Sequence, residues 1–523
     1  MKKSQITYIK NILLPCLVYS GLTGIFTGCL IFLFKLSVSR VVPFSESVYA
    51  FVRENPAFLP LLLIGAAAVG GISALILHYA PDCKGGGIPT AITLLRGLVS
   101  FSWVKSIFLL FPSALLTYLC GVPLGTEGPS VQMGTAVGRG TVRIFVKKHL
   151  AWDRFVMTGG ASAGFAAATG APLTGIFFSF EEAHKRFSPM LFMVSAVSAL
   201  TSTAVMQLLC PLAGISPSLF HLKTDASLPL TFLWSAAIIG IICGLVGAGF
   251  TKLYGIIHSF IDTKLKKIPF AVKIILVFTM TAVIGFFIPD CLGSGDGLIE
   301  ALFDRQGAWQ MLIVCFCIRG IMLIIANNVG ITGGLFVPTL AFGAVIGGLC
   351  GKAMIGMGIL PEEYYIITVV LGIASFLSAS SRTPIMATAF TIEALCGLQN
   401  ILPVIMGVTL SYITVETLGI HDFTDIVIDG KLKAAHKGKK DRVFDIKMTV
   451  AEGAFAEGKE IRDILWPPTC TVLSVHKNPT THHHSHTGIS AGDMLTLHYH
   501  TYDPEETRRS LEAILGKQNG SCQ

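Results

Sequence analysis

GTEGPSVQMGTAVG, residues 125–138, places one carboxylate, Glu127, between two glycines and next to a proline. The run before this stretch, residues 106–124, is apolar and carries no charge. Glycine and proline interrupt helices, and an acid inside an apolar layer costs free energy unless it has a partner or a function. The stretch therefore predicts a helix that begins inside such a layer, with an acid at its start.

The composition places the chain in a membrane. Of its 523 residues, 52% are hydrophobic and 13% are charged, and the mean hydropathy is +0.68, whereas about 25% charge is usual in soluble proteins. Apolar runs of about 20 residues, long enough to cross the hydrocarbon layer, recur from residue 12 to residue 420. The first run is long and lacks a cleavage site, so we expect a polytopic protein whose mature chain begins at Met1.

The distribution of charges and cysteines argues against a nucleic-acid surface and against a metal site. The net charge of +8 is concentrated in short basic segments between apolar runs, and such loops face the cytoplasm by the positive-inside rule. Their separation argues against a nucleic-acid surface. The thirteen cysteines lie mostly in apolar stretches without metal-ligand spacing, so we expect small core residues and no metal site.

The chain contains an internal repeat. Three pairs of segments align in the same order, at offsets of 209, 208 and 212 residues: 125–138 with GLFVPTLAFGAVIG at 334–347, GGGIPTAI at 85–92 with GSGDGLIE at 293–300, and GAPLTGIFFSFEEA at 170–183 with RTPIMATAFTIEAL at 382–395. Repeats with interrupted segments at matching positions are typical of secondary transporters, whose site lies between the halves. The sequence has no GxxxxGK[ST] motif for an ATP-driven motor.

The apolar runs and the repeat predict a membrane domain over residues 1–430, with repeat halves at about 10–215 and 230–425. After about residue 430 the composition becomes that of a soluble protein, which predicts a basic linker over 431–442 and a small domain over 443–523. In the last of these, strand patterns occur in RVFDIKMTV, TCTVLSVHK and DMLTLHYHT, a short helix in GKEIRDILW, and a capped amphipathic helix in DPEETRRSLEAILG. The expected fold class is an all-α polytopic membrane protein with an internal repeat and a small cytoplasmic α+β domain.

Three glycine-rich breaks, KGGGIP, GTEGP and GGLFVP, each precede an apolar run. Irregular backbone is tolerated in hydrocarbon only where it is buried in protein or lines a polar cavity. A helix that begins at such a break has unpaired amide groups and the positive end of its dipole at the N-terminus, and both attract anions. We therefore expect the three breaks to converge on an anion site.

These motifs resemble those of the CLC family of chloride channels and chloride/proton exchangers. The family's GSGIP stands here as GGGIP (85–89), its G(K/R)EGP as GTEGP (125–129) and its GxFxP as GLFVP (334–338). The motifs occur in family order over most of residues 10–430. The resemblance implies inverted halves, a homodimer with one anion pathway in each subunit, and transport without a cofactor rather than enzymatic catalysis.

The resemblance also implies roles for individual residues. Glu127 corresponds to the gating glutamate, whose carboxylate competes with an anion and carries protons on the external side. Glu182 corresponds to the inner glutamate that passes protons in exchangers. The implied anion-binding positions are Gly85, Gly86, Thr126, Glu127, Gly128, Leu335, Phe336, Val337 and Phe423.

Two of these positions depart from the family pattern. Gly86 replaces the usual serine, and Phe423 aligns with the tyrosine expected near the start of the last membrane helix. Both hydroxyl donors to a central chloride are therefore missing, and chloride selectivity and proton coupling are in question.

In the repeat Glu181 is matched by Glu393, whereas Glu182 has no acidic mate. We expect the matched pair to be structural and Glu182 to be functional, with a cytoplasmic-surface ion pair as the alternative for Glu182.

The tail resembles a TrkA C-terminal (RCK-type) domain, through GKEIRDILWPPTCTVLSVHKN and ISAGDMLTLHYH. The resemblance implies a cytoplasmic regulatory module that dimerises or binds a small ligand, and we expect both termini on the cytoplasmic side of the cell membrane. Within the tail, THHHSHT at 481–487 is either a solvated loop or a metal- or pH-sensitive site.

Several function classes follow from these features. Chloride/proton antiport is the leading hypothesis, and a passive channel for chloride or another monovalent anion is the alternative within the family. An intramembrane enzyme would need a nucleophile and a base, and no core histidine has a partnering serine or cysteine motif. A ligand-sensing receptor would not need three convergent anion-binding breaks, and flux into liposomes would separate these classes.

Overall fold

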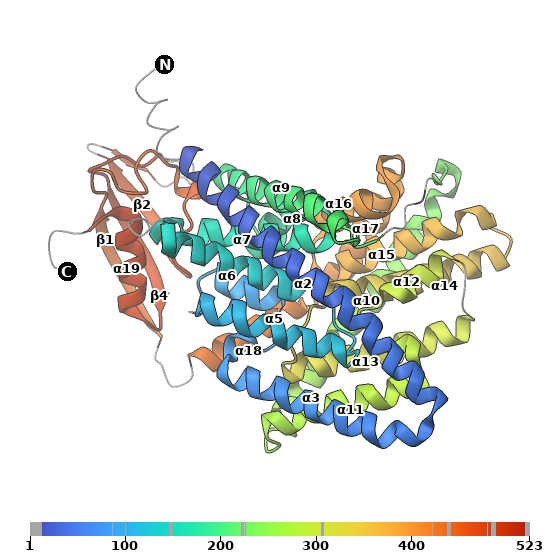
Figure 1. Cartoon of the computed structure of the whole chain (residues 1–523). Coiled ribbons are helices and arrows are strands. Elements are labelled where there is room, and N and C mark those ends of the chain that lie inside the picture. The colour runs from blue at the N-terminus through green and yellow to red at the C-terminus, as the bar shows by residue number, and fades with distance from the viewer. Residues whose placement is uncertain are drawn as a thin grey trace.

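The computed structural model describes residues 13–517, except residues 86, 100, 146–149, 221–223, 225, 305–307, 421, 437–440, 478–479 and 483–487. Helices form a broad body, and a small sheet-containing domain lies at one edge of it (Figure 1). In the described part of the chain, nine helices are long and apolar enough to cross a membrane. The chain is therefore a multi-pass membrane protein, as its composition predicts.

The helices of the body occur in two series of the same order. The first series comprises α2 (Leu14–Glu54), α3 (Leu59–Tyr79), α4 (Ile88–Leu95), α5 (Trp103–Leu119), α6 (Glu127–Phe145), α7 (Asp153–Thr169), α8 (Pro172–Phe178) and α9 (Pro189–Leu212). The second comprises α10 (Leu233–Thr263), α11 (Phe270–Phe287), α12 (Asp296–Phe303), α13 (Trp309–Val329), α14 (Phe336–Gly356), α15 (Tyr365–Ser381), α16 (Pro384–Thr391) and α17 (Ile401–Thr417). A further helix, α18 (Phe423–Ala435), follows the second series.

The two series match in small details, which confirms the repeat. The same tripeptide, Pro-Asp-Cys, forms a single 3₁₀ turn at Pro81–Cys83 and again at Pro289–Cys291, 208 residues later. Helices α8 and α16 each continue into a π-helical turn, at Ser179–Ala183 and Ile392–Cys396. The Pro-Asp-Cys match is a fourth repeated segment that the sequence comparison missed.

Glu181 and Glu393 join the two halves reciprocally. The Glu181 carboxylate accepts hydrogen bonds of 2.9 and 2.7 Å from two amides at the N-terminus of α16. The Glu393 carboxylate accepts two bonds of 3.1 Å from the corresponding amides of α8. A carboxylate at a helix N-terminus satisfies unpaired amides and the helix dipole, so this matched pair is structural, as expected.

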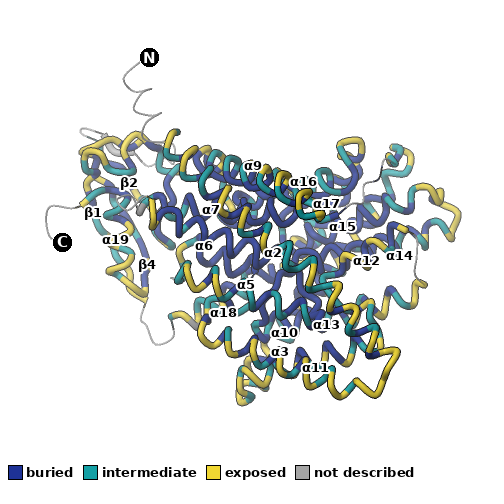
Figure 2. Tube along the Cα trace, in the orientation of Figure 1, coloured by how far each residue is buried: buried dark blue, intermediate teal, exposed yellow. Residues whose placement is uncertain are grey.

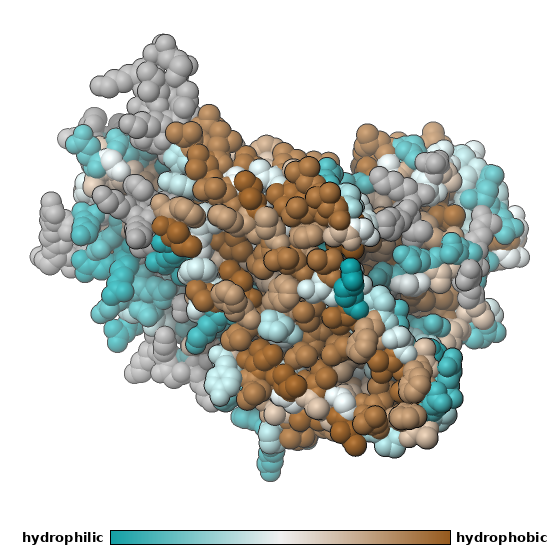
Figure 3. Space-filling model, viewed as in Figure 1, coloured by the Kyte–Doolittle hydropathy of each residue, from teal (hydrophilic) through white to brown (hydrophobic). Residues whose placement is uncertain are grey.

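The middle of the body is its most buried part. Helices α6, α7 and α15 are largely buried, whereas α3 and α11 expose many side chains (Figure 2), and apolar side chains cover much of the visible surface of the body (Figure 3). A Cβ atom built on Gly343 would lie 2.5 Å from the carbonyl oxygen of Gly372, and Gly134 meets Gly160 in the same way in the first half. These glycines let the central helices approach closely, which stabilises packing where no hydrophobic effect acts.

The tail forms an α+β domain. It contains β1 (Arg442–Thr449), β2 (Thr471–Lys477), β3 (Thr480–His482), β4 (Met494–Thr501) and α19 (Pro504–Leu515), and its antiparallel sheet has the strand order β1-β4-β2-β3. Methionine, valine and leucine side chains of the sheet form one core with α19. The predicted strands and the amphipathic helix are therefore present, whereas most of the THHHSHT segment lies outside the described residues.

Two details of the tail differ from expectation. The short helix predicted in GKEIRDILW is only a 3₁₀ turn, Ile461–Asp463. It stops there because prolines follow at residues 467 and 468, which disfavour helix before them, and because carbonyls 464–466 accept bonds from arginines of the body. The predicted linker at 431–442 begins as the end of α18, which continues to Ala435.

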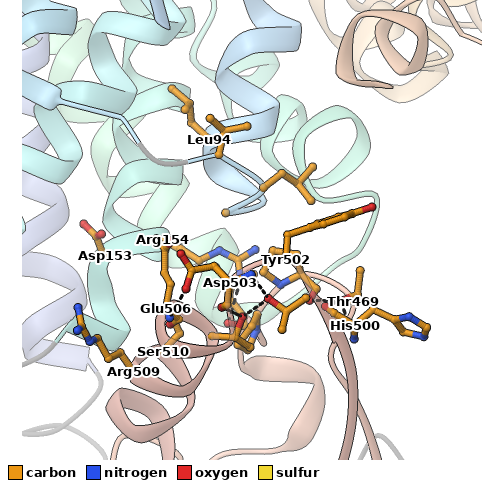
Figure 4. A pocket seen from close by; sticks show the side chains of 18 of the residues that line it. Leu94, Asp153, Arg154, Thr469, His500, Tyr502, Asp503, Glu506, Arg509 and Ser510 are labelled. Carbon is orange, nitrogen blue, oxygen red and sulfur yellow. Dashed lines mark hydrogen bonds between the residues drawn. The ribbon is translucent and has the colours of Figure 1, made fainter. Parts of the chain in front are cut away.

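The tail is docked on the body by arginine side chains that bind backbone carbonyls of the tail. Arg154 donates to the carbonyl oxygens of Leu465 (3.2 Å) and Trp466 (2.6 Å), and Arg186 donates to that of Ile464 (3.0 Å). A cavity of about 1240 Å³ lies between the two parts. Figure 4 shows Arg154 on its body side, facing side chains of β4 and α19.

Candidate functional site

The glycine breaks of the two halves pair with each other. The amide of Gly125 donates to the carbonyl of Gly334, and the amide of Gly334 donates to that of Gly125, both at 2.7 Å. These two residues are repeat mates, 209 residues apart, so their antiparallel bridge places a local two-fold axis between them. Helices α6 and α14 each begin two residues after the bridge, so their N-termini meet at the axis and the helices run in opposite senses away from it.

The third break reaches the same place. A Cβ atom built on Gly128 would lie 2.7 Å from the Cα atoms of both Gly87 and Gly334. Gly87 directly precedes α4, so the N-termini of α4, α6 and α14 lie around one junction. The three breaks therefore converge, as expected, and glycine is required there because backbone occupies the space that a side chain would need.

The Glu127 side chain lies in this junction. It is 0% exposed, and its Oε1 atom accepts a hydrogen bond of 2.9 Å from the Thr126 hydroxyl. Its Oε2 atom has no hydrogen-bond partner within strict geometry among the described residues, although the backbone amides of Glu127 and Val337 face the carboxylate. A Cβ on Gly125 would lie 2.5 Å from Oε2, so the carboxylate occupies the free space over that glycine.

The other predicted anion-binding residues of the GTEGP and GGLFVP breaks lie at the starts of α6 and α14. Leu335, Phe336 and Val337 are buried at the start of α14, and Thr126 and Gly128 flank Glu127. The Phe336 ring packs edge-on against two other phenyl rings, each at a centroid distance of 5.0 Å. The junction thus combines backbone donors with an apolar wall, and in such surroundings charges interact more strongly than in water.

Gly85, a predicted anion-binding position of the GGGIP break, differs from the predicted positions of the other two breaks. Gly85 has a φ of +60°, and its amide donates to the carbonyl of Gly330 at 2.9 Å, so this amide already has a partner. Gly86 lies outside the described residues. Of this break, Gly87 is the residue that the structure brings to the junction.

A set of hydroxyl groups on α5 holds the breaks in place. The Tyr118 hydroxyl donates to the Gly125 carbonyl at 2.7 Å, the Thr117 hydroxyl donates to the Thr332 carbonyl at 2.8 Å, and the Ser113 and Thr332 hydroxyls lie 2.8 Å apart. We did not predict these residues. The available signal was polar side chains at positions 113 and 117, one helical turn apart, on an otherwise apolar helix.

Phe423 is the first residue of α18 and is buried. Its ring lies 5.8 Å from that of Tyr254, and the Tyr254 hydroxyl donates to Asn327. The next residue, Thr424, is 3% exposed, and its hydroxyl has no hydrogen-bond partner among the described residues. The start of α18 therefore carries a buried, unpartnered hydroxyl one residue after Phe423, a position that the sequence analysis did not single out.

Glu182 lies in the π-helical turn that follows α8, a local structure often found at functional sites. It is 4% exposed, and its Oε2 atom has no hydrogen-bond partner in the described part of the chain. Arg96 fixes the backbone there by donating to the carbonyls of Glu182 (3.2 Å) and Ala183 (2.8 Å). Burial contradicts the surface ion pair considered as the alternative for Glu182.

Known proteins resemble this chain in sequence and in fold. The H(+)/Cl(-) exchange transporter ClcA of Salmonella paratyphi B is 27% identical over 409 residues, which is 76% of this chain and 85% of that protein. A slow cyanobacterial Cl-/H+ antiporter superposes with a TM-score of 0.74 at 24% identity, covering 80% of this chain and 98% of that one. A CLC-type fluoride/proton antiporter has a TM-score of 0.65 at 20% identity, covering 77% of this chain and 96% of that one.

A family model gives the assignment. The model described as voltage gated chloride channel matches residues 65–416, which include all three glycine breaks, Glu127 and Glu182. The match ends before the tail, so the resemblance of the tail to a TrkA C-terminal domain stays a prediction. The helical body matches the model over residues 65–416, and the chain belongs to the voltage-gated chloride channel family, that is, the CLC family.

Proposed function

We propose that the chain exchanges chloride for protons and that Glu127 acts as both gate and external proton carrier. The observation that carries this proposal is the position of its carboxylate, buried among helix N-termini that attract anions. A deprotonated carboxylate takes the place that chloride would occupy. A protonated one has lost its charge, and hence its attraction to the amides, and leaves the junction open to chloride.

Glu182 supplies the inner end of the proton route in this proposal. It is a second buried acid with an unpartnered oxygen, and a passive anion channel has no need of one. The names of the relatives, an exchange transporter and two antiporters, favour antiport over the channel alternative. The same reasoning favours transport over enzymatic catalysis.

We also propose the assembly and orientation that the family resemblance implies. The protein is a homodimer with both termini in the cytoplasm, and the tail is a regulatory domain of the TrkA-C type. The tail contacts Arg186, four residues after Glu182, so a change in docking reaches the π-helical turn directly. We place the predicted small ligand of the tail in the cavity of Figure 4, between the tail and the body.

Glu182→Gln tests the proposal because it keeps the shape of the side chain and removes its titratable proton. We expect proton transport to fall about a hundredfold, while chloride still moves. The measurement is simultaneous chloride and proton flux from liposomes under an imposed chloride gradient. If the unmodified protein moves chloride and never protons, the chain is a channel.

The hydroxyl groups near the pathway predict the anion selectivity. Because positions 86 and 423 offer no hydroxyl, nitrate or bromide should compete well with chloride, and Gly86→Ser should sharpen the preference for chloride. If the buried Thr424 hydroxyl serves the anion, Thr424→Val should weaken that preference by about tenfold, the worth of one hydrogen bond to a charged group. Equal anion permeability ratios in all three proteins would contradict this assignment.

A further inference from the structure

We propose that Asp422 is a proton-relay residue, which takes protons from a cavity beside α17 and α18 and passes them to Glu182. The proposal rests on the proposed role of Glu182 as the inner proton acceptor. It adds the residue through which protons reach that acceptor, and it is carried by the position of Asp422 between a cavity and a buried acid.

The cavity lies on the side of the body where the tail docks. It has a volume of about 640 Å³ and is lined by side chains of the π-helical turn, the start of α16, the end of α17 and the start of α18. Arg186 lines it and also binds the tail carbonyl of Ile464. Asp422 is part of the lining, whereas Glu182 is not, so Glu182 needs an intermediate to exchange protons with this cavity.

Asp422 has the position that such an intermediate requires. It is 5% exposed and immediately precedes α18, where its Oδ1 atom accepts a hydrogen bond of 3.1 Å from the Thr424 amide. It shares the cavity lining with Phe180 and Glu181, the two residues that precede Glu182, and its charge acts on the Glu182 carboxylate. One acid therefore lines the cavity beside the π-helical turn that carries the inner acid.

The neighbouring charges leave Asp422 without an ion pair among the described residues. Of the cations that act on it, Lys185 pairs with Asp425 at 3.7 Å and Arg382 pairs with Glu416 at 3.4 Å. The other charged groups near Glu182 are also engaged, since Arg96 donates to backbone carbonyls and Glu181 caps α16. Neither of the two buried acids therefore has an ion-pair partner among the described residues.

Two buried carboxylates whose charges interact favour a state in which one of them is protonated, because two like charges repel. In the inward step, a proton from cavity water forms an O–H bond with the Asp422 carboxylate. That bond then breaks as the proton passes, through water, to the Glu182 carboxylate, and Asp422 regains its negative charge. The outward step is the reverse, and charge and protons balance in both directions.

Asp422→Asn tests the relay against a purely structural role. Asparagine keeps the side-chain oxygen that caps α18 and cannot carry the proton, so proton flux should fall at least about tenfold while chloride still moves. Asp422→Glu should recover most of the proton flux because it restores a carboxylate. The double variant Lys185→Gln/Asp425→Asn is the control, since it removes a carboxylate from the lining of the same cavity together with its partner cation. It frees no cation to pair with Asp422, and it should leave both fluxes near those of the unmodified protein.

Each outcome decides the proposal. Unchanged proton flux in Asp422→Asn, or equal losses in Asp422→Asn and in the double variant, would overturn the relay. If Glu182→Gln stops protons while Asp422→Asn does not, the relay is wrong and the proposed function stands; if the unmodified protein moves no protons, both fail. Should Asp422→Asn not fold, Asp422→Ser replaces it, because serine also caps helices well and does not titrate in this range.

Discussion

Replacing Glu127 with glutamine is expected to abolish proton transport while chloride still crosses the membrane. Glutamine has nearly the same volume but no charge and no titratable proton, so it resembles the protonated state of the acid. The attraction of a carboxylate to the N-termini of α6 and α14 is then lost, and chloride meets no competing anion at the junction. Chloride and proton fluxes from the same liposomes measure both effects at once.

Glu127→Ala provides a second variant with a different shape. It removes the side chain and the Thr126 hydrogen bond together, and it should also move chloride without protons. Agreement between the two variants assigns the loss to the carboxyl group rather than to its packing. Uphill proton transport by either variant would show that Glu127 does not carry the protons.

A methyl group at position 128 is expected to reduce chloride flux through packing alone. In Gly128→Ala the new Cβ would lie 2.7 Å from two backbone Cα atoms, those of Gly87 and Gly334. Backbone cannot move aside as a flexible side chain can, so the three helix N-termini must separate. Overpacking costs about 1–3 kcal/mol or more, and we expect a lower thermal midpoint and chloride flux reduced at least about tenfold.

Gly65→Ala is the matched control, because a Cβ at that position in α3 meets no atom within 4 Å. Its thermal midpoint and chloride flux should stay near those of the unmodified protein. If Gly128→Ala and Gly65→Ala transported chloride equally well, close convergence of the three breaks would not be required for transport.

Much of the fold could be predicted from the sequence, because its signals are local and repeated. Glycines and prolines at fixed offsets predicted the two halves, and alternating side chains predicted the strands of the tail. The failed helix in GKEIRDILW shows the limit. Its apolar spacing suits a helix, but its carbonyls bind Arg154 and Arg186, which lie about 300 residues earlier in the sequence, and no local pattern reveals such contacts.

The candidate site could be predicted to within one residue at several positions. Glu127 is conspicuous because acids are rare in apolar segments, but Gly87 rather than Gly85 approaches the junction, and the buried Thr424 hydroxyl next to Phe423 was not singled out. One residue turns a side chain by about 100° around a helix, so the residue that faces a site depends on how the helix is packed. Asp422 escaped notice because its significance comes from Glu182, which is distant in sequence.

The bridge between Gly125 and Gly334 bears on the origin of the protein. Across it, the repeat mates of Thr126 and Glu127 are Leu335 and Phe336, so a backbone shared by both halves carries an acid in one and an aromatic ring in the other. Two acids would bring like charges together at one axis. If the halves descend from a duplicated gene, the duplication copied the backbone scaffold into both halves, but only one half carries the acid. Mutations in one copy can then retune coupling, whereas the glycines at the axis are constrained in both.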